Sequence, residues 1–270
     1  MIVDGSSETR KILPETGTLM PVLFIGHGNP MNAVQDNTFS ESWKQIATTL
    51  PRPEAIVCIS AHWETLKTRV TAMDHPRTIH DFYGFPQELH AVRYPAPGFP
   101  GLARFLCTSI TSQALVQDME WGLDHGTWSV LVRLFPKADI PVVQLSLDVE
   151  KDPAMHLGLG QSLQFLRSRG VLIVCSGNCV HNLGAMVWKD TAFDWATETD
   201  ETIKDAILND RIHQLVRYEA LPHSSLAIPT SEHYLPMLYA LGLKLKNEPV
   251  QFFAEQITLG SISMRSFKIG

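Results

Sequence analysis

The chain has 270 residues, of which 44% are apolar and 19% are charged, and this composition supplies ample material for a globular core. The formal net charge of −6, with no cluster of Lys or Arg, argues against a nucleic-acid-binding surface. No apolar run approaches the roughly 20 residues that a membrane-spanning helix needs. The composition therefore favours a globular protein that acts neither on nucleic acids nor within a membrane.

Residues 1–19 are expected to form a flexible lead-in to a single domain over residues 20–270. The lead-in carries Asp4 and Glu8 and lacks the apolar centre of a secretory signal. Of the four cysteines, Cys58 and Cys175 interrupt Val/Ile runs, which is typical of buried, reduced thiols rather than of a disulfide framework. These features predict a cytoplasmic protein.

The first two thirds of the chain alternate between predicted strands and helices. Short continuous apolar runs predict buried strands, which cover residues 21–25, 55–59, 140–147 and 171–175. The predicted helices cover residues 42–50, 101–112, 127–135 and a segment that begins at Pro153 with Asp152 as its N-cap. The polar and aromatic segment 75–101 is rich in Pro and Gly, and an irregular stretch of this length indicates a lid or binding loop.

The last third is predicted to be helical and then to end in strands. A long helix is expected over residues 192–218, and a short one over 236–241 is expected to end at Gly242. Residues 251–268 alternate in polarity around Gly260, which predicts a terminal hairpin. Strands alternating with helices predict a single α/β domain whose central sheet is mostly parallel or mixed and is flanked by helices.

Histidines follow several of the predicted strands. His27 comes after the first strand, His62 after the second, and His181 shortly after the fourth. In open α/β sheets ligands bind outside the carboxyl ends of the strands, so we expect the active site there, with these side chains in one crevice. Imidazole is the commonest metal ligand in proteins, and His233, just before the predicted 236–241 helix, is a candidate to complete a metal site.

Simpler explanations remain open for each of these signals. A lone histidine at a strand end is more often hydrogen-bonded than a ligand, and neither His27 nor His62 belongs to a sharp metal signature. The spacing of Cys175 and Cys179 would suit a metal or redox pair, but buried thiols are the favoured interpretation. The aromatics of residues 82–85 belong either to the core or to the wall of a site for a flat substrate.

Taken together, the motifs resemble those of the 4,5-DOPA extradiol dioxygenase family. This family belongs to the class III extradiol ring-cleavage dioxygenases, of the protocatechuate 4,5-dioxygenase type. The resemblance runs in order from about Met20 to the C-terminus. The motifs that carry it are Gly26-His-Gly-Asn-Pro-Met31, Ser60-Ala-His-Trp63, Ile79-His-Asp-Phe-Tyr-Gly-Phe-Pro86, Tyr94-Pro-Ala-Pro-Gly98, Leu123-Asp-His-Gly-Thr-Trp128, Ser176-Gly-Asn-Cys-Val-His-Asn182 and Glu232-His-Tyr-Leu-Pro236.

The resemblance implies an enzyme that opens a catechol ring beside its two hydroxyls with non-haem Fe(II) and O₂. By position, His27 and His62 match two metal ligands, and His233 stands where relatives in the wider superfamily have a glutamate ligand. His181 matches the acid/base histidine and is also a candidate ligand. His125 matches a second active-site histidine that would hydrogen-bond oxygen or substrate.

The resemblance also implies a substrate-binding loop that covers the site, and its candidate residues are His80, Phe82 and Tyr83. This loop would exclude water from the site during the reaction.

The third histidine departs from the usual oxygenase set of two histidines and one carboxylate. Three histidines also suit zinc, which stands above iron in the order of metal affinities. We therefore expect one divalent metal per chain, Fe(II) for activity and Zn(II) as a competitor in purified protein. The departure leaves two alternatives open, a zinc-dependent hydrolase or lyase on the same scaffold and a metal-binding protein without catalysis. The physiological catechol and the oligomeric state are not determined by the sequence.

Overall fold

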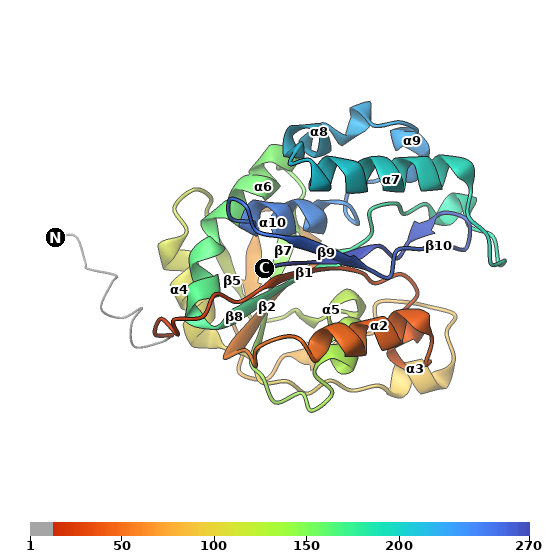
Figure 1. The fold of residues 1–270 in the computed structure, drawn as a ribbon. Helices are drawn as coiled ribbons and strands as arrows, with labels where there is room; N and C mark the ends of the chain where they lie inside the picture. The colour runs from red at the N-terminus through yellow and green to blue at the C-terminus, as the bar shows by residue number, and fades with distance from the viewer. Residues whose placement is uncertain (1–12) are drawn as a thin grey trace.

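The computed structural model describes residues 13–270, and residues 1–12, the first part of the predicted lead-in, lie outside this range. A central sheet separates two layers of helices, with α6, α7 and α10 on one side and α2 and α5 on the other (Figure 1). The predicted single α/β domain with a mixed sheet flanked by helices is confirmed.

Within residues 13–270 the sheet has eight strands in the order β5-β3-β7-β2-β8-β1-β12-β9. Its central strands β7, β2, β8 and β1 are mutually parallel, whereas β12 runs antiparallel to both β1 and β9. Two small sheets pair β4 with β6 and β10 with β11. The strands are β1 (Val22–Gly26), β2 (Ala55–Thr65), β3 (Arg69–Thr71), β4 (Arg77–Thr78), β5 (Val116–Asp118), β6 (Gly122–Leu123), β7 (Val142–Asp148), β8 (Val171–Gly177), β9 (Val250–Phe253), β10 (Ile257–Thr258), β11 (Ile262–Ser263) and β12 (Ser266–Ile269).

The helices lie between these strands and after them. The α-helices are α2 (Thr38–Ala47), α3 (Gln87–Ala91), α4 (Pro100–Ser109), α5 (His125–Leu134), α6 (Pro153–Ser162), α7 (Asp194–Leu208), α8 (Ile212–Val216), α9 (Ser224–Ala227) and α10 (Leu235–Leu243). Short 3₁₀ helices are η1 (Pro30–Ala33), η2 (Gln164–Arg169), η3 (Leu183–Ala185) and η4 (Tyr218–Ala220).

The four predicted buried strands are confirmed as the centre of the sheet, where both faces are covered. In β1, Val22 and Phe24 face the core beneath α6, α7 and α10, whereas Leu23 and Ile25 face the core beneath α2 and α5. Successive side chains of a strand point to opposite faces, and burial of both faces explains why these strands read as continuous apolar runs.

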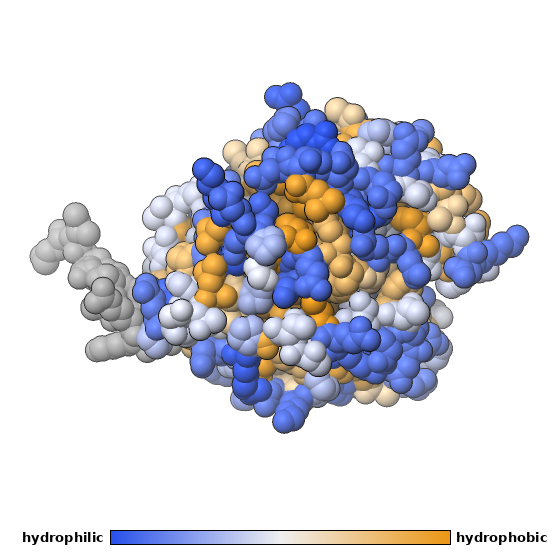
Figure 2. Space-filling view, viewed as in Figure 1, coloured by the Kyte–Doolittle hydropathy of each residue, from blue (hydrophilic) through white to orange (hydrophobic). Residues whose placement is uncertain are grey.

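The surface reflects this layering. On the face shown in Figure 2, apolar residues gather over the middle of the molecule, while hydrophilic residues cover much of the regions above and below. Among the helices of residues 13–270, none has the length and apolar character that crossing a membrane requires.

Several predicted boundaries were wrong for local reasons. The helix expected from residue 42 begins at Thr38, because Asn37 caps the amides of Phe39 and Ser40 while the Ser40 hydroxyl accepts from the Asn37 amide. The long helix expected over residues 192–218 breaks after α7, where Asp210 adopts a left-handed φ of 56°.

Gly242 does not end the last helix, because α10 continues to Leu243. A Cβ atom at this glycine would lie 2.3 Å from the carbonyl oxygen of Leu157 on α6. The glycine therefore serves the close approach of α10 to α6 rather than a helix cap.

The terminal hairpin predicted over residues 251–268 is present as antiparallel pairing of β9 with β12 and of β10 with β11. Of the predicted lead-in, Leu13 is buried and the Thr16 amide donates to the carbonyl of Ser168 over 2.9 Å. The flexibility of residues 1–12 stays a prediction.

Candidate active site and metal centre

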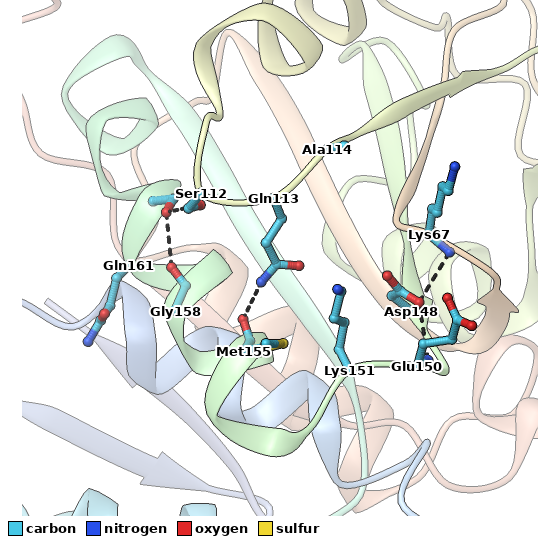
Figure 3. A pocket seen from close by; sticks show the side chains of 11 residues that line it. Lys67, Ser112, Gln113, Ala114, Asp148, Glu150, Lys151, Met155, Gly158 and Gln161 are labelled. Carbon is cyan, nitrogen blue, oxygen red and sulfur yellow. Dashed lines mark hydrogen bonds between the residues drawn. The ribbon is translucent and has the colours of Figure 1, made fainter.

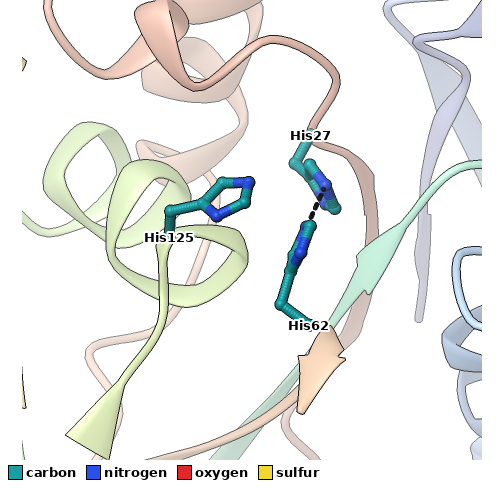
Figure 4. Close-up of side chains that lie close together, drawn as sticks. All are labelled: His27, His62 and His125. Atoms are coloured by element: carbon teal, nitrogen blue, oxygen red, sulfur yellow. Dashed lines mark hydrogen bonds between the residues drawn. The ribbon is translucent and has the colours of Figure 1, made fainter. Parts of the chain in front are cut away.

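Five histidines from five separate segments meet at the carboxyl ends of the central strands. His27 directly follows β1, His62 lies in β2, and His125 is the first residue of α5. His181 follows β8, and His233 precedes α10. Figure 4 shows the rings of His27, His62 and His125 pointing toward one another. The expected position of the site at the strand ends is thus where the structure brings these residues together.

The sequence had placed His62 after the second strand, and this was wrong, because His62 lies within β2. Strand β2 continues to Thr65, with a register shift between Ile59 and Glu64 in its pairing with β7. A bulge of this kind redirects side chains, and it often occurs beside active sites.

The three predicted metal ligands lie close to one another. The ring centroids of His27 and His62 are 5.0 Å apart, those of His27 and His233 are 5.3 Å apart, and those of His62 and His233 are 4.9 Å apart. The Nε2 atoms of His27 and His62 are separated by 3.0 Å. His181 stacks on His233 with centroids 3.5 Å apart, and His125 lies 3.8 Å from His62.

The candidate ligand atoms fall into two neighbouring groups. Those of His27, His62 and His125 lie within 4.8 Å of one another, and so do those of His181, Glu232 and His233. The predicted set of His27, His62 and His233 draws on both groups. The geometry therefore brings all five imidazoles together, and the choice of ligands among them is a proposal that we argue below.

A serine behind His27 determines which of its ring nitrogens faces the cluster. Nδ1 of His27 lies 3.0 Å from the Ser176 hydroxyl, which donates its proton to the carbonyl of Gly126 over 2.6 Å. The hydroxyl has only one proton, so it accepts from the N–H at Nδ1. The lone pair of His27 Nε2 then points toward His62 and is available to a metal.

A carboxylate has the same role behind His233. Nδ1 of His233 donates to Oε1 of Glu232 over 3.0 Å, and this leaves Nε2 free. The backbone carbonyl of His233 accepts from the amide of Asn178 over 2.8 Å. Gly177 permits this approach, since a Cβ atom there would lie 2.2 Å from the same carbonyl oxygen.

Asp81 supports the other pair of rings from the loop of residues 75–101. Its Oδ1 accepts from the backbone N–H of His125 over 2.8 Å. Its Oδ2 lies 3.0 Å from Nδ1 of His125, out of line for a hydrogen bond, and 3.7 Å from Nδ1 of His62. One carboxylate therefore faces the Nδ1 side of both rings.

A second carboxylate, Asp124, is fully buried and ties β2 to the start of α5. It accepts from the Ser60 hydroxyl over 2.7 Å, from the Thr127 amide over 3.1 Å and from the Gln144 amide group. Burial raises the pKa of Asp124. These bonds place His125 at the first turn of the helix that Asp124 caps.

The supporting residues Ser176, Asp81 and Glu232 were missed as functional residues by the sequence reasoning. Each stands within or beside a motif that contains a candidate histidine. That neighbourhood was the available signal, since metal-binding imidazoles usually donate their second N–H to a carboxylate or another oxygen.

The environment keeps the rings of His27, His62, His181 and His233 neutral. Burial is the main cause that lowers the pKa of His27, His62 and His233, and the neighbouring histidines lower it further. Burial also lowers the pKa of His181 to about 3. Neutral imidazole is the form that binds metals, so the donor chemistry of the cluster fits a divalent ion.

Glu232 behaves in the opposite way to an ordinary buried acid. Burial alone would raise the pKa of its carboxyl group, but the hydrogen bond and charge interaction with His233, together with the hydrogen bonds from the Glu232 backbone and from Thr230, outweigh burial and bring the pKa to about 2. The carboxylate behind His233 is therefore ionised.

A cavity of about 480 Å³ opens onto the cluster, and all five histidines line it. Phe82 and Tyr83, two of the predicted substrate-binding residues, also line it. His80, the third, does not. Its ring packs 5.4 Å from that of Trp128, and its Nε2 lies 3.0 Å from the carbonyl oxygen of Val92.

A larger hollow of about 850 Å³ lies elsewhere on the molecule and holds no imidazole (Figure 3). Its most buried carboxylate, Asp148, already accepts from the backbone amides of Lys67 and Glu150 over 3.1 and 3.2 Å. The chemistry therefore belongs to the smaller, histidine-lined cavity.

Comparison with known proteins shows the family to which this chain belongs. The family described as "Catalytic LigB subunit of aromatic ring-opening dioxygenase" matches residues 21–262. The chain belongs to the LigB family. This chain is 47% identical to the 4,5-DOPA dioxygenase extradiol of Escherichia coli (strain K12) over 261 residues, which are 94% of this chain and 96% of that one. It is 37% identical to the 4,5-DOPA dioxygenase extradiol of Beta vulgaris over 254 residues, which are 91% of this chain and 94% of that one.

A solved structure shares the fold as well. The crystal structure of an uncharacterized protein from Escherichia coli K12 superposes on this chain with a TM-score of 0.82 at 44% identity. The superposition covers 93% of this chain and 100% of that one. The LigB-family chain is thus an aromatic ring-opening dioxygenase, an oxidoreductase that acts on a small aromatic molecule with O₂ at a non-haem metal. The alternatives of a zinc hydrolase or lyase and of a non-catalytic binding protein are not favoured.

Proposed function

We propose that this dioxygenase cleaves the ring of a catechol, DOPA or a DOPA-like molecule, beside its two hydroxyls, with Fe(II) held by His27, His62 and His233. The observation that carries the ligand set is the mutual approach of these rings, whose centroids are 4.9–5.3 Å apart. Each ring has an oxygen atom on its Nδ1 side, at 3.0 Å for His27 and His233 and at 3.7 Å for His62. The relatives are named as dioxygenases of DOPA, itself a catechol, and this supports a catechol as the substrate.

When bound, Fe(II) would lower the pKa of the catechol hydroxyls and supply the redox chemistry that O₂ requires. Zinc would fit the same imidazoles but has no accessible second oxidation state. Fe(II) is therefore the metal that we expect in the active enzyme, and Zn(II) a competitor in purified protein.

His181 is proposed as the acid and base. Its ring lies parallel to that of His233 and lines the cavity, and burial lowers its pKa and keeps the ring neutral, the form that has a lone pair for a substrate proton. The same group would return the proton when the ring opens. A direct bond from His181 to the metal is the competing role, because its nitrogens lie in one group with those of His233.

His125 is proposed to hydrogen-bond oxygen or substrate. Asp81 lies on its Nδ1 side and binds its backbone amide, which leaves Nε2 for a ligand. A donor held in place before the reaction stabilises developing negative charge at little reorganisation cost.

Phe82 and Tyr83 are proposed to contact the catechol ring from the wall of the cavity. For His80, a substrate contact stays a prediction, and its place behind Phe82 supports a role in positioning this aromatic loop, since their ring centroids are 5.8 Å apart.

Reconstitution tests the proposal. The metal-free protein is loaded anaerobically with Fe(II) or with Zn(II) and then mixed with L-DOPA in air. We expect the Fe(II) form to consume O₂ and to form a yellow, conjugated semialdehyde, and the Zn(II) form to do neither. Ring opening by the Zn(II) form, or no oxygen uptake by the Fe(II) form with any catechol, would contradict the proposal.

A further inference from the structure

Two aromatic side chains at the mouth of the histidine-lined cavity are unusually exposed. Tyr83 is 94% exposed and Trp188 is 76% exposed, the two highest values among the large apolar side chains of residues 13–270. Both line the cavity that the five histidines share. A single exposed apolar residue needs no explanation, but two around one cavity indicate a surface that a ligand covers. We refer to Tyr83 and Trp188 as the aromatic mouth.

The backbone that carries Trp188 is held in place on both sides. Before it, the Val187 amide donates to the carbonyl of Leu259 over 2.9 Å. After it, the carbonyl of Thr191 accepts from the Gly260 amide over 2.9 Å. The exposure of Trp188 therefore does not come from a loosely held segment, since the fold fixes its backbone at the cavity while its ring remains in water.

The histidines define the direction in which a catechol would lie. His27 and His233 are buried, so the cluster forms the inner end of the cavity and the exposed rings form its outer end. In DOPA the side chain, which we call the arm, is attached on the side of the ring opposite the two hydroxyls. With the hydroxyls at the proposed metal site, the arm points toward the aromatic mouth.

The charges that line the cavity favour a cation on the arm. None of the residues that line it is Lys or Arg, and its one lining carboxylate is Asp81. A second carboxylate, that of Glu232, lies 3.0 Å behind the lining residue His233. Apart from the proposed metal, an ammonium group would therefore meet no positive charge in the lining of the cavity, and a carboxylate on the arm would find no cationic partner there and would stay in water.

Aromatic rings attract a cation as well as an apolar group. The face of an aromatic ring carries partial negative charge, and an ammonium group within about 6 Å of the ring centre is stabilised by it, most strongly over Trp. Trp188 is the indole of the mouth, and Tyr83 adds a phenol ring. The combination of exposed aromatic rings and absent lining cations is typical of a site for an ammonium group.

We propose that the aromatic mouth binds the ammonium group of the substrate's arm, with Trp188 as its main contact and Tyr83 as a second ring. The proposal deepens the function proposed above and rests on it, because it requires the catechol hydroxyls to lie at the histidine cluster. It assigns Trp188 as a specificity-determining residue that contacts the arm and not the reacting carbons.

The test measures binding without turnover. The Fe(II)-loaded enzyme is titrated anaerobically with L-DOPA and with 3-(3,4-dihydroxyphenyl)propionate, which has the same ring, arm length and carboxylate but no ammonium group. We expect L-DOPA to bind about two- to fivefold more tightly, as a cation–π contact at an exposed position provides. Dopamine should show the same advantage over 4-ethylcatechol, a second pair in which neither molecule has a carboxylate.

Two variants of one residue identify the interaction. Trp188→Leu keeps an apolar side chain but removes the aromatic face, and it should abolish most of the preference for the ammonium group. It should change the Kd of 3-(3,4-dihydroxyphenyl)propionate less than about twofold, because that molecule lacks the interacting group. Trp188→Phe keeps an aromatic face and should retain part of the preference. The high exposure of Trp188 means that both variants leave the core intact.

Met119→Ala is the matched control, since Met119 is 65% exposed and does not line the cavity. It should leave the affinities for all four catechols unchanged.

The outcomes separate the two proposals. Equal affinities within both pairs, or an unchanged preference in Trp188→Leu, would overturn the role of the aromatic mouth even if catechols are cleaved in air. An equal loss in Trp188→Phe and Trp188→Leu would also overturn it, because the aromatic face would then not be what binds the ammonium group. If the preference and its loss in Trp188→Leu alone are found but no catechol is cleaved, the ammonium contact stands and the proposed ring cleavage fails.

Discussion

Glu232 accepts a hydrogen bond of 3.0 Å from Nδ1 of His233, so an ionised carboxylate lies directly behind an imidazole that we propose as a metal ligand. In the proposed metal site, the negative charge that a histidine in place of a carboxylate ligand would remove is thus present one residue away. A carboxylate in this position makes the imidazole a stronger ligand and holds its orientation.

Replacing Glu232 with Gln should weaken metal binding by roughly 10- to 100-fold, the usual effect of removing such a supporting group. Glutamine keeps the size of the side chain and removes its charge. The measurement is a titration of the metal-free protein against a competing chelator. Glu120→Gln is a suitable control, since Glu120 is exposed and lies outside the cavity. Equal affinities for the Glu232→Gln variant and the wild type would show that Glu232 does not act through the metal.

Two histidine variants should separate metal binding from proton transfer. His62→Ala removes a proposed ligand and should purify without metal. His181→Ala should keep its metal and lose ring cleavage, because the proposed acid and base is absent. Metal content by elemental analysis and oxygen uptake give both results. His213→Ala, at an exposed position on α8, should change neither. Loss of metal from His181→Ala would instead make His181 a ligand.

Two glycine variants should have opposite effects on stability. At Gly177 a Cβ atom would lie 2.2 Å from the carbonyl oxygen of His233, so Gly177→Ala should displace His233 and cost about 1–3 kcal/mol. At Gly158, in the interior of α6, nothing lies within 4 Å, and alanine should add about 0.5–1 kcal/mol by its helix preference. Urea unfolding measures both free energies, and metal affinity should fall only in Gly177→Ala. A Gly177→Ala protein with unchanged stability and metal affinity would show that His233 does not depend on this contact.

Acid should destabilise the metal-free protein. Burial, the main cause, lowers the pKa of His27, His62, His233 and His181 below the ordinary value of 6.5, whereas the unfolded chain keeps that value. Below pH 6.5 the unfolded state therefore binds more protons than the folded state, and the free energy of unfolding falls as the pH falls. For His181 this loss continues down to a pH of about 3.

The measurement is the melting temperature of the metal-free protein between about pH 7 and pH 5. We expect it to fall on acidification and to fall less in His181→Ala, which has one fewer buried imidazole to protonate. Asp124 and Glu64 work in the opposite direction, because burial raises the pKa of each, but they are two carboxyl groups against four imidazoles. A melting temperature that does not change over this interval would contradict the prediction.

Much of the fold could be predicted because burial leaves a local trace in the chain. Strands β1, β2, β7 and β8 are covered on both faces and read as apolar runs, and His27 follows one of these runs directly. Strands β3 and β5 were missed, since each has only three residues and lies toward one edge of the sheet.

The supporting contacts could not be predicted in the same way. Ser176 and His27 are 149 positions apart in the chain, and their contact exists only because β1 and β8 are neighbours in parallel register. Nothing in the local pattern of either segment records this pairing.

The sequence alone determined the four buried strands at the centre of the sheet, the histidines at or near their ends, and which family the motifs resemble, because hydrophobic periodicity and short motifs are local properties. The tertiary structure decided that five imidazoles meet, that Glu232, Asp81 and Ser176 stand behind them, and that Tyr83, Leu183 and Trp188 surround one cavity. These relations depend on strand order and register, and both are set by contacts between residues that lie far apart in the chain.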